Sequence, residues 1–245
     1  MPVFPVNRHA PCPCKSGRRY KSCCFARDRA RADMLLTAVQ SHRAVDDVLR
    51  VVLPLVESRG EHTIACRAGC NACCSQFIRV TWAEALAIAA WLLEPEQSEL
   101  LAHFEATLPS WSTAVDEPRR VIDALLERHA GPPLTAPDQE RYLGATFDYH
   151  RRGAMCPFNN AQGNCAIYPV RPLPCRATYV EGTADFCPPD RPPGPSVVKH
   201  PSLQGALQDL RALLLEAAHS AARPAEQSLP SFVAAALVEL RAALA

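Results

Sequence analysis

The feature that most constrains this chain is the grouping of its cysteines. Eight of its twelve cysteines form two blocks: Cys66, Cys70, Cys73 and Cys74, and then Cys156, Cys165, Cys175 and Cys187. Four thiols within nine residues are too crowded to serve as core filler. Thiolates at two- and three-residue separations can converge on one soft metal ion or iron–sulfur cluster. We therefore expect the protein to be organised around a metal centre.

Length and composition favour one sizeable domain with a small appendage. The chain has 245 residues, is 48% hydrophobic and carries a formal net charge of +1, so its bulk charge gives no argument for or against nucleic acid. The amino terminus has no signal-peptide core, and no apolar run approaches the ~18 residues of a membrane span. We expect a cytoplasmic protein with reduced thiols and no membrane association.

The first 31 residues are poor in apolar side chains and rich in positive charge, so they need a cross-link, such as a bound metal, to fold. This segment carries the remaining four thiols: Cys12, Cys14, Cys23 and Cys24. Tetrahedral Zn²⁺ with four sulfur ligands fits this set and would supply folding energy. Ser16 and Gly17 allow a tight reversal between the two pairs. We predict a zinc knuckle over residues 1–27.

Residues 12–24 resemble the SEC-C motif, the zinc knuckle found at the carboxyl terminus of the SecA translocation ATPase and appended to many other proteins. The usual glycine at the position of Lys15 is absent. Cys24 stands where histidine is common, which preserves ligation.

Two roles remain open for the knuckle, because a motif does not by itself define a function. The knuckle either only tethers the chain end or docks on a protein partner through Arg18, Arg19 and Lys21. Nucleic acid is a less favoured partner, since few aromatic residues accompany this basic run.

Helical periodicity predicts a mainly α domain over residues 32–245, with irregular cysteine-bearing loops held together by metal. Helices are expected at 32–56, 81–94, 95–108, 115–130, 137–152, 203–221 and 229–244. Pro54 should kink or end the first helix. Thr81 and Glu84 form a capping box after a short extended segment at 76–80.

In the first cysteine block, Cys70 and Cys73 can face one metal across a tight turn. Gly69 can adopt the positive φ that brings Cys66 to the same side. Cys73 and Cys74 are adjacent, so their sulfur atoms point apart in an extended chain. Either a turn brings both to one metal, or the two serve separate centres.

The second block has no helical period. Residues 156–158 and 163–168 read as two short strands whose turn brings Cys156 and Cys165 together, and a proline-bracketed segment presents Cys175. Three arginines could offset the negative charge of several thiolates, with ordinary surface positions as the alternative: Arg67, Arg171 and Arg176.

These motifs resemble the zinc- or iron-chelating family named for its CxxCxxCC signature, also called YkgJ-type cysteine-cluster proteins. The resemblance spans about residues 62–180, with a family-like core of about 62–190, and includes Cys156-Pro-Phe, Gly163-Asn-Cys-x-Ile-Tyr and Arg171-Pro-x-x-Cys-Arg. Three residues instead of two separate Cys66 from Cys70. Cys187 lies beyond the matched motifs.

The resemblance implies metal chelation, with the metal left open. Some relatives are lysine N-methylases that act on flagellin, so an iron–sulfur-dependent protein lysine N-methylase is the alternative function. The spacing of Cys66, Cys70 and Cys73 also matches the radical-SAM pattern. However, repeated β-α units and a G-x-G loop are missing from the pattern. Thiol–disulfide exchange by Cys70 and Cys73 lacks its usual βαβ context.

We expect a metal-binding protein with zinc at the knuckle and either zinc or an iron–sulfur cluster at the main site. The pattern assigns no reaction. His62 and His150 are read as ordinary surface or capped histidines. Phe77, Trp82 and Trp91 are expected in the core.

Overall fold

The computed structural model describes residues 8–12, 14, 16–58, 63–66, 69–128, 134–183, 187, 198, 200–219 and 226–244. Within these ranges the protein is mainly α, as predicted. The α-helices are α1 (Phe25–Ser58), α2 (Trp82–Leu92), α3 (Ser98–Arg128), α4 (Ala136–Arg151), α5 (Leu173–Ala177), α6 (Pro201–His219) and α7 (Leu229–Leu244). Four 3₁₀ helices accompany them: η1 (Tyr20–Ser22), η2 (Ala72–Ser75), η3 (Pro95–Gln97) and η4 (Tyr168–Val170).

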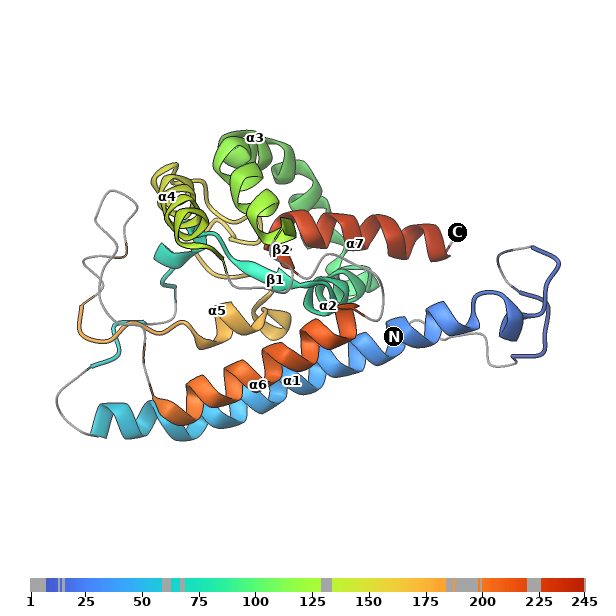
Figure 1. The fold of residues 1–245 in the computed structure, drawn as a ribbon, viewed down its shortest axis with the longest axis horizontal. Coiled ribbons are helices and arrows are strands. Elements are labelled where there is room, and N and C mark those ends of the chain that lie inside the picture. Colours follow the sequence, from blue (N-terminus) through green and yellow to red (C-terminus); the bar gives the residue numbers. More distant parts are fainter. Residues whose placement is uncertain are drawn as a thin grey trace.

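The long helix α1 forms one layer of the molecule with α6, which runs beside it in the opposite direction (Figure 1). Its buried stripe follows helical spacing and includes Val45, Leu49 and Val52. The helix begins at Phe25, seven residues before the predicted start, and continues one turn past Pro54 to Ser58. The amino-terminal knuckle therefore stands at the free end of a continuous helix (Figure 1).

Helix α2 lies at the centre of the fold. The predicted capping box is confirmed, because Glu84 N–H donates to the Thr81 hydroxyl and the Glu84 carboxylate accepts from Thr81 N–H. The residue before the helix ends strand β1 (Arg79–Thr81), which pairs antiparallel with β2 (Glu226–Ser228). Of the predicted extended segment at 76–80, only Arg79 and Val80 lie in the strand that pairs with β2. Trp82 is buried against Phe232 of α7 in an edge-to-face contact.

The two helices predicted at 95–108 and 115–130 are one helix, α3, which passes through Pro109 and Pro118. A proline inside a helix removes one backbone hydrogen bond. Here burial offsets that loss, because α3 buries Phe104, Trp111 and Val115 along its length. None of the helices in the described ranges is long and apolar enough to cross a membrane.

Candidate metal centres

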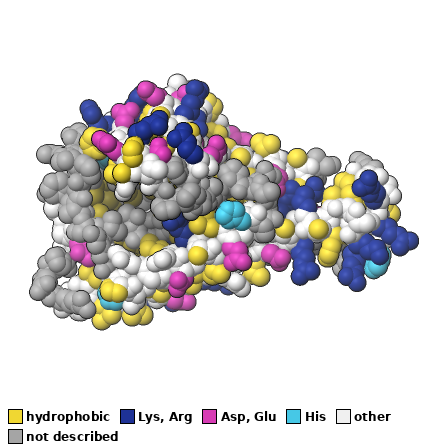
Figure 2. Space-filling model, in the orientation of Figure 1, with side chains coloured by type: hydrophobic (Ala, Val, Ile, Leu, Met, Phe, Trp, Pro, Cys, Tyr) yellow, Lys and Arg dark blue, Asp and Glu magenta, His cyan; other side chains and the backbone are white. Residues whose placement is uncertain are grey.

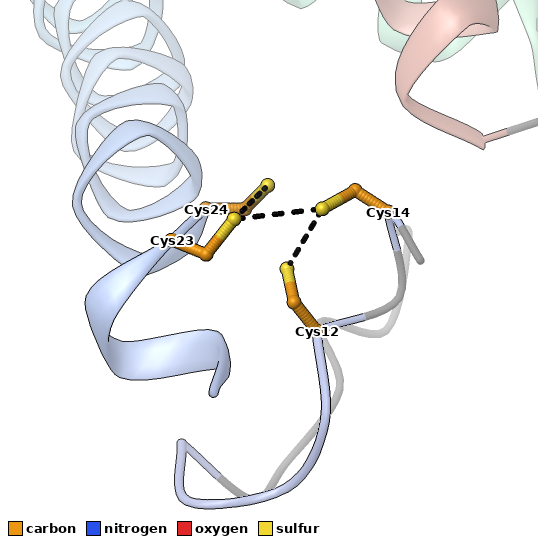
Figure 3. Close-up of side chains that lie close together, drawn as sticks. All are labelled: Cys12, Cys14, Cys23 and Cys24. Carbon is orange, nitrogen blue, oxygen red and sulfur yellow. Dashed lines mark hydrogen bonds between the residues drawn. The ribbon is translucent and has the colours of Figure 1, made fainter. Parts of the chain in front are cut away.

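The four amino-terminal cysteines converge on one point. Their sulfur atoms all lie within 4.8 Å of one another, and Cys14 Sγ is 3.3 Å from Cys12 Sγ and 3.5 Å from Cys23 Sγ (Figure 3). Sulfur atoms around a tetrahedral zinc ion, with Zn–S bonds of about 2.3 Å, are about 3.8 Å apart. In the described parts of the chain, no other set of three or more metal-ligating side chains is grouped in this way. The spacing fits one zinc ion.

Short-range contacts build this knuckle. Pro11 pairs with Arg19 across a turn in which Gly17 has a φ of 73°, as the reversal predicted. Cys12 N–H donates to the Arg18 carbonyl at 2.8 Å. The module's own apolar cluster is small: Cys12, Tyr20 and Cys24, with Cys23 and Phe25 packed against them.

The electrostatics of the knuckle suit a bound cation. Hydrogen bonding with Ser16 and with Cys12 lowers the pKa of the exposed Cys14 thiol to about 6. Hydrogen bonding with Cys12 and burial raise the pKa of Cys24 to about 12, and the Arg27 guanidinium opposes this only in part. Four adjacent thiols cannot all ionise without added positive charge. A bound Zn²⁺ would supply that charge.

The first main block folds as a turn and a short 3₁₀ helix. Gly69 has the predicted positive φ, 81°, and η2 carries both Cys73 and Cys74. The buried Ser75 hydroxyl anchors η2, because it donates to the Ala72 carbonyl and lies 3.0 Å from Nδ1 of the buried His150. His150 is therefore neither a surface residue nor a cysteine-loop ligand in this arrangement; it is part of the support beneath the loop.

The second main block touches the first directly. Cys156 N–H donates to the Cys74 carbonyl at 2.8 Å. The expected strands at 156–158 and 163–168 are absent from these described residues, which form a turn with a single bridge between Asn159 and Cys165. The Asn160 side chain accepts from Asn164 N–H at 2.9 Å, which closes the loop before a ladder can form. The turn nevertheless places Cys156 near Cys165, as predicted.

Cys175 lies on the short helix α5, although the sequence indicated no helix there. Glu84 holds the start of α5, because its Oε1 accepts from Leu173 N–H at 2.7 Å while its Oε2 accepts from Thr81. Glu84 is 2% exposed, so this carboxylate is a buried link between α2 and the cysteine segment. Sequence reasoning found its capping role and missed this second one.

Arg176 fixes the same segment to α1. Its guanidinium donates to Asp46 at 2.6 Å and to the backbone carbonyls of Arg171 and Pro169. Arg171 stacks on Tyr168 with 4.0 Å between its guanidinium carbon and the ring centroid. Both arginines lower the pKa of Cys165 against the effect of burial, in agreement with the charge-offsetting role predicted for them. Arg67, Lys15 and His62 lie outside the described residues.

The thiols of the main site influence one another strongly. Cys73 and Cys74 share a hydrogen bond, which raises the pKa of Cys73 and lowers that of Cys74 to about 6. Burial raises the pKa of Cys156 to about 12, and the thiolates of Cys74 and Cys165 add to that shift. Such a crowded set of ionisable thiols is typical of a metal-binding site.

Cys66 lies beside the segment that follows α5. The Val180 N–H donates to Cys66 Sγ at 3.3 Å. Burial and the nearby thiolates of Cys66 and Cys70 raise the pKa of Cys187.

Two family models match the chain. The CxxCxxCC model, described as "Putative zinc- or iron-chelating domain", matches residues 65–189. The SEC-C motif matches residues 10–26. Both ranges contain the cysteine groups described above. No curated protein matches the chain, and no solved structure matches it either.

Proposed function

The chain belongs to the CxxCxxCC family of zinc- or iron-chelating domains, and we propose that it holds metal at two places, a zinc knuckle and a larger thiolate site. One observation carries the proposal for the larger site. Cys74, Cys156, Cys165 and Cys175 come from the matched region, and the fold brings their segments together: Cys156 N–H donates to the Cys74 carbonyl, and Cys156, Cys165 and Cys175 pack against one hydrophobic core. Thiols are rarely gathered in this way except to bind metal.

The surrounding residues would do two things for a bound metal. Glu84 and Arg176 hold the segment of Cys175 against α2 and α1. Arg171 supplies positive charge beside Cys175 and Cys165, which favours their thiolate forms. A bound soft metal would accept the thiolates as ligands and neutralise most of their charge.

The metals are assigned from sulfur spacing and ligand number. Zinc is proposed for the knuckle because its four sulfur atoms already have nearly tetrahedral separations. At the main site the sulfur atoms are more widely spread, and the eight thiols there suit either zinc or an iron–sulfur cluster. Reduced thiols are needed for both, so we place the protein in the reducing cytoplasm.

Metal identity is the first measurement. Protein purified without oxygen is analysed for zinc, iron and acid-labile sulfide, and its visible spectrum is recorded on the same sample. Iron with matching sulfide and a broad thiolate-to-iron band establishes a cluster. Colourless protein with zinc beyond one ion per chain establishes a zinc site. A double variant, Cys14→Ser with Cys23→Ser, removes the knuckle's share as a control.

Metal that disappears entirely in this control would contradict the main-site proposal, because only the knuckle would then bind. Methyl transfer to a protein lysine stays a prediction from the family resemblance. An iron–sulfur result would be the reason to test it with S-adenosylmethionine.

The knuckle also offers a docking surface, and we propose an acidic protein segment as its partner. Lys and Arg side chains gather at the end of the molecule that carries the knuckle (Figure 2). The exposed basic residues of the knuckle and the start of α1 are Arg8, Arg18, Arg19, Lys21, Arg27 and Arg29. A patch of one charge sign attracts the opposite sign.

Binding of the full chain to a labelled polyglutamate peptide, measured by fluorescence anisotropy, tests this surface. We expect binding that weakens with salt and is lost when Arg18, Arg19 and Lys21 are all changed to Glu. Preferential binding to a single-stranded oligonucleotide would instead favour nucleic acid and contradict the proposal.

A further inference from the structure

The loop that carries Cys156 and Cys165 also carries a buried amide group that no hydrogen bond satisfies. Asn159 Nδ2 is buried, and among the residues that the structure describes it has no hydrogen-bond acceptor. A buried N–H without an acceptor costs free energy, so native proteins contain few of them. The amide of Asn159 therefore requires an explanation.

Backbone hydrogen bonds place Asn159 among the cysteines of the main site. Asn159 N–H donates to the Cys156 carbonyl at 2.9 Å, and Cys156 N–H donates to the Cys74 carbonyl at 2.8 Å. Asn159 also forms an antiparallel bridge with Cys165. Three cysteines from both blocks are thus connected to this one residue through the backbone.

The bridge puts the side chains of Asn159 and Cys165 on the same face of the loop. Two backbone bonds flank it, at 2.9 and 2.8 Å: Asn160 N–H to the Asn164 carbonyl, and Ala166 N–H to the Phe158 carbonyl. This pattern defines Asn159 and Cys165 as a non-hydrogen-bonded pair, the kind in which opposite side chains are closest. The Asn159 amide therefore lies next to the Cys165 side chain.

The residues on either side of Asn159 are anchored. Phe158 is buried, and its ring stacks on Phe104 with 4.5 Å between the ring centroids. Asn160 Oδ1 accepts from Asn164 N–H at 2.9 Å, which closes the loop on its outer side. Asn159 is therefore held in place between a core residue and a closed turn.

The acceptors close to this amide are sulfur atoms. Asn159 is near enough to Cys74 to lower the pKa of its thiol, after the larger effect of the hydrogen bond with Cys73. Even so, Asn159 Nδ2 makes no hydrogen bond of normal geometry. Arg171 Nε, in the same block, is a second buried nitrogen without an acceptor among the described residues. Buried N–H donors beside cysteines suit a metal-bound thiolate, which is a stronger acceptor than a neutral thiol.

We propose that Asn159 is a positioning residue of the main metal site and donates its side-chain N–H to the metal-bound thiolate of Cys74. This inference rests on the metal-binding function proposed above. Metal keeps Cys74 in the thiolate form, and the proton of the thiol leaves to solvent. The hydrogen bond then withdraws electron density from the sulfur and reduces the repulsion between thiolates that share the metal. Asn159 therefore stabilises the metal-loaded protein and not the metal-free one.

Metal affinity and metal-free stability test this role in opposite directions. The parent protein is the full chain with Cys14→Ser and Cys23→Ser, which isolates the main site, and the metal is Co²⁺ in competition with a chelator. Asn159→Leu should weaken Co²⁺ binding by about 10- to 100-fold, the usual effect of removing a hydrogen bond to a metal ligand. In metal-free protein it should leave the melting temperature unchanged or raise it, because Leu has the same branched shape and removes an unpaired N–H. A residue that only supported the loop would lower both quantities.

Two further variants sharpen the test. Asn159→Asp keeps the shape of the side chain and removes both N–H donors, so it should weaken Co²⁺ binding at least as much as Asn159→Leu. Gln162→Leu makes the same amide-to-Leu change at an exposed position of the same loop and should alter neither quantity.

Parent-like Co²⁺ affinity in either Asn159 variant would overturn the assignment. So would a metal-free melting temperature of Asn159→Leu that is lower than that of the parent. A parent protein that binds no Co²⁺ would contradict the proposed main site itself, and the role of Asn159 with it.

Discussion

The knuckle and the main cysteine site bring their thiols together in opposite ways. In the knuckle, four thiols from residues 12–24 meet through short-range turns, with almost no apolar core around them. In the main site, thiols spread over residues 66–187 are brought together by helices that bury a large core. We therefore expect the knuckle to gain much of its stability from a bound metal, whereas the main site is built by helices that pack around their own core.

The two regions differ in what the binding energy of a metal is used for. A module with only a small core gains much of its stability from a bound metal. A larger domain can place its ligands first, and the metal then stabilises a preformed arrangement.

The largest effect is expected from Glu84→Ala, which tests whether the helical frame places the main site. The change leaves the buried N–H groups of Thr81 and Leu173 without their acceptor and removes a fully buried side chain. We expect a loss of about 4 kcal/mol in the free energy of unfolding, measured by urea titration. Glu99→Ala, at an exposed position in the first turn of α3, is the control and should change little. If the free energy of unfolding of Glu84→Ala equals that of the control, Glu84 does not stabilise the packing of α5 against α2.

Cys175→Ser comes next, because it separates the contribution of the metal from that of the frame. In metal-loaded protein we expect a loss of about 3 kcal/mol, since binding of a ligand to the native state adds stability. In metal-free protein the loss should be less than about 1 kcal/mol, because one sulfur is replaced by one oxygen. Thermal melts with and without chelator measure both values. Equal losses in the two states would show that the site contributes packing only.

A smaller effect is expected from Cys23→Ser in the knuckle. The variant should lose the zinc proposed for the knuckle, and proteolysis should then cleave near the start of the chain. The free energy of the main unfolding transition should change by less than about 0.5 kcal/mol, because the knuckle contacts little of the core. Limited proteolysis and melting of the same sample test both statements. A large shift in the main transition would show that the two regions fold as one unit.

The smallest effect concerns the ionisation of Cys14 in metal-free protein. Hydrogen bonding from Ser16 is the largest cause that lowers its pKa to about 6 from the ordinary value of 9.0. A lowered pKa means that the thiolate form favours the folded knuckle above pH 9, and this contribution is lost as the pH falls through about 6. Alkylation of Cys14 by iodoacetamide should therefore be half-maximal near pH 6. Ser16→Ala should move the midpoint to higher pH, and an unmoved midpoint would rule out the Ser16 hydroxyl as its cause.

Local features of the fold were predictable from neighbouring residues. The capping box of Thr81 and Glu84 was found because its two partners are three residues apart. The α3 helix was divided wrongly, because Pro109 and Pro118 are helix breakers by local rules and only the burial of the surrounding face keeps the helix continuous. Helix α5 was missed for a related reason, since its first turn is held by Glu84 from a distant part of the chain.

Residue spacing alone was enough to predict a mainly α protein with two thiolate regions. It also predicted the four cysteines of the knuckle and the reversal between them. Those features depend on residues a few positions apart, where spacing and backbone geometry allow few alternatives. The contact between the Cys156 N–H and the Cys74 carbonyl, and the attachment of the Cys175 helix to Glu84, depend on the tertiary structure. These neighbours are set by the burial of helices against one another, and cysteine spacing carries no information about that packing.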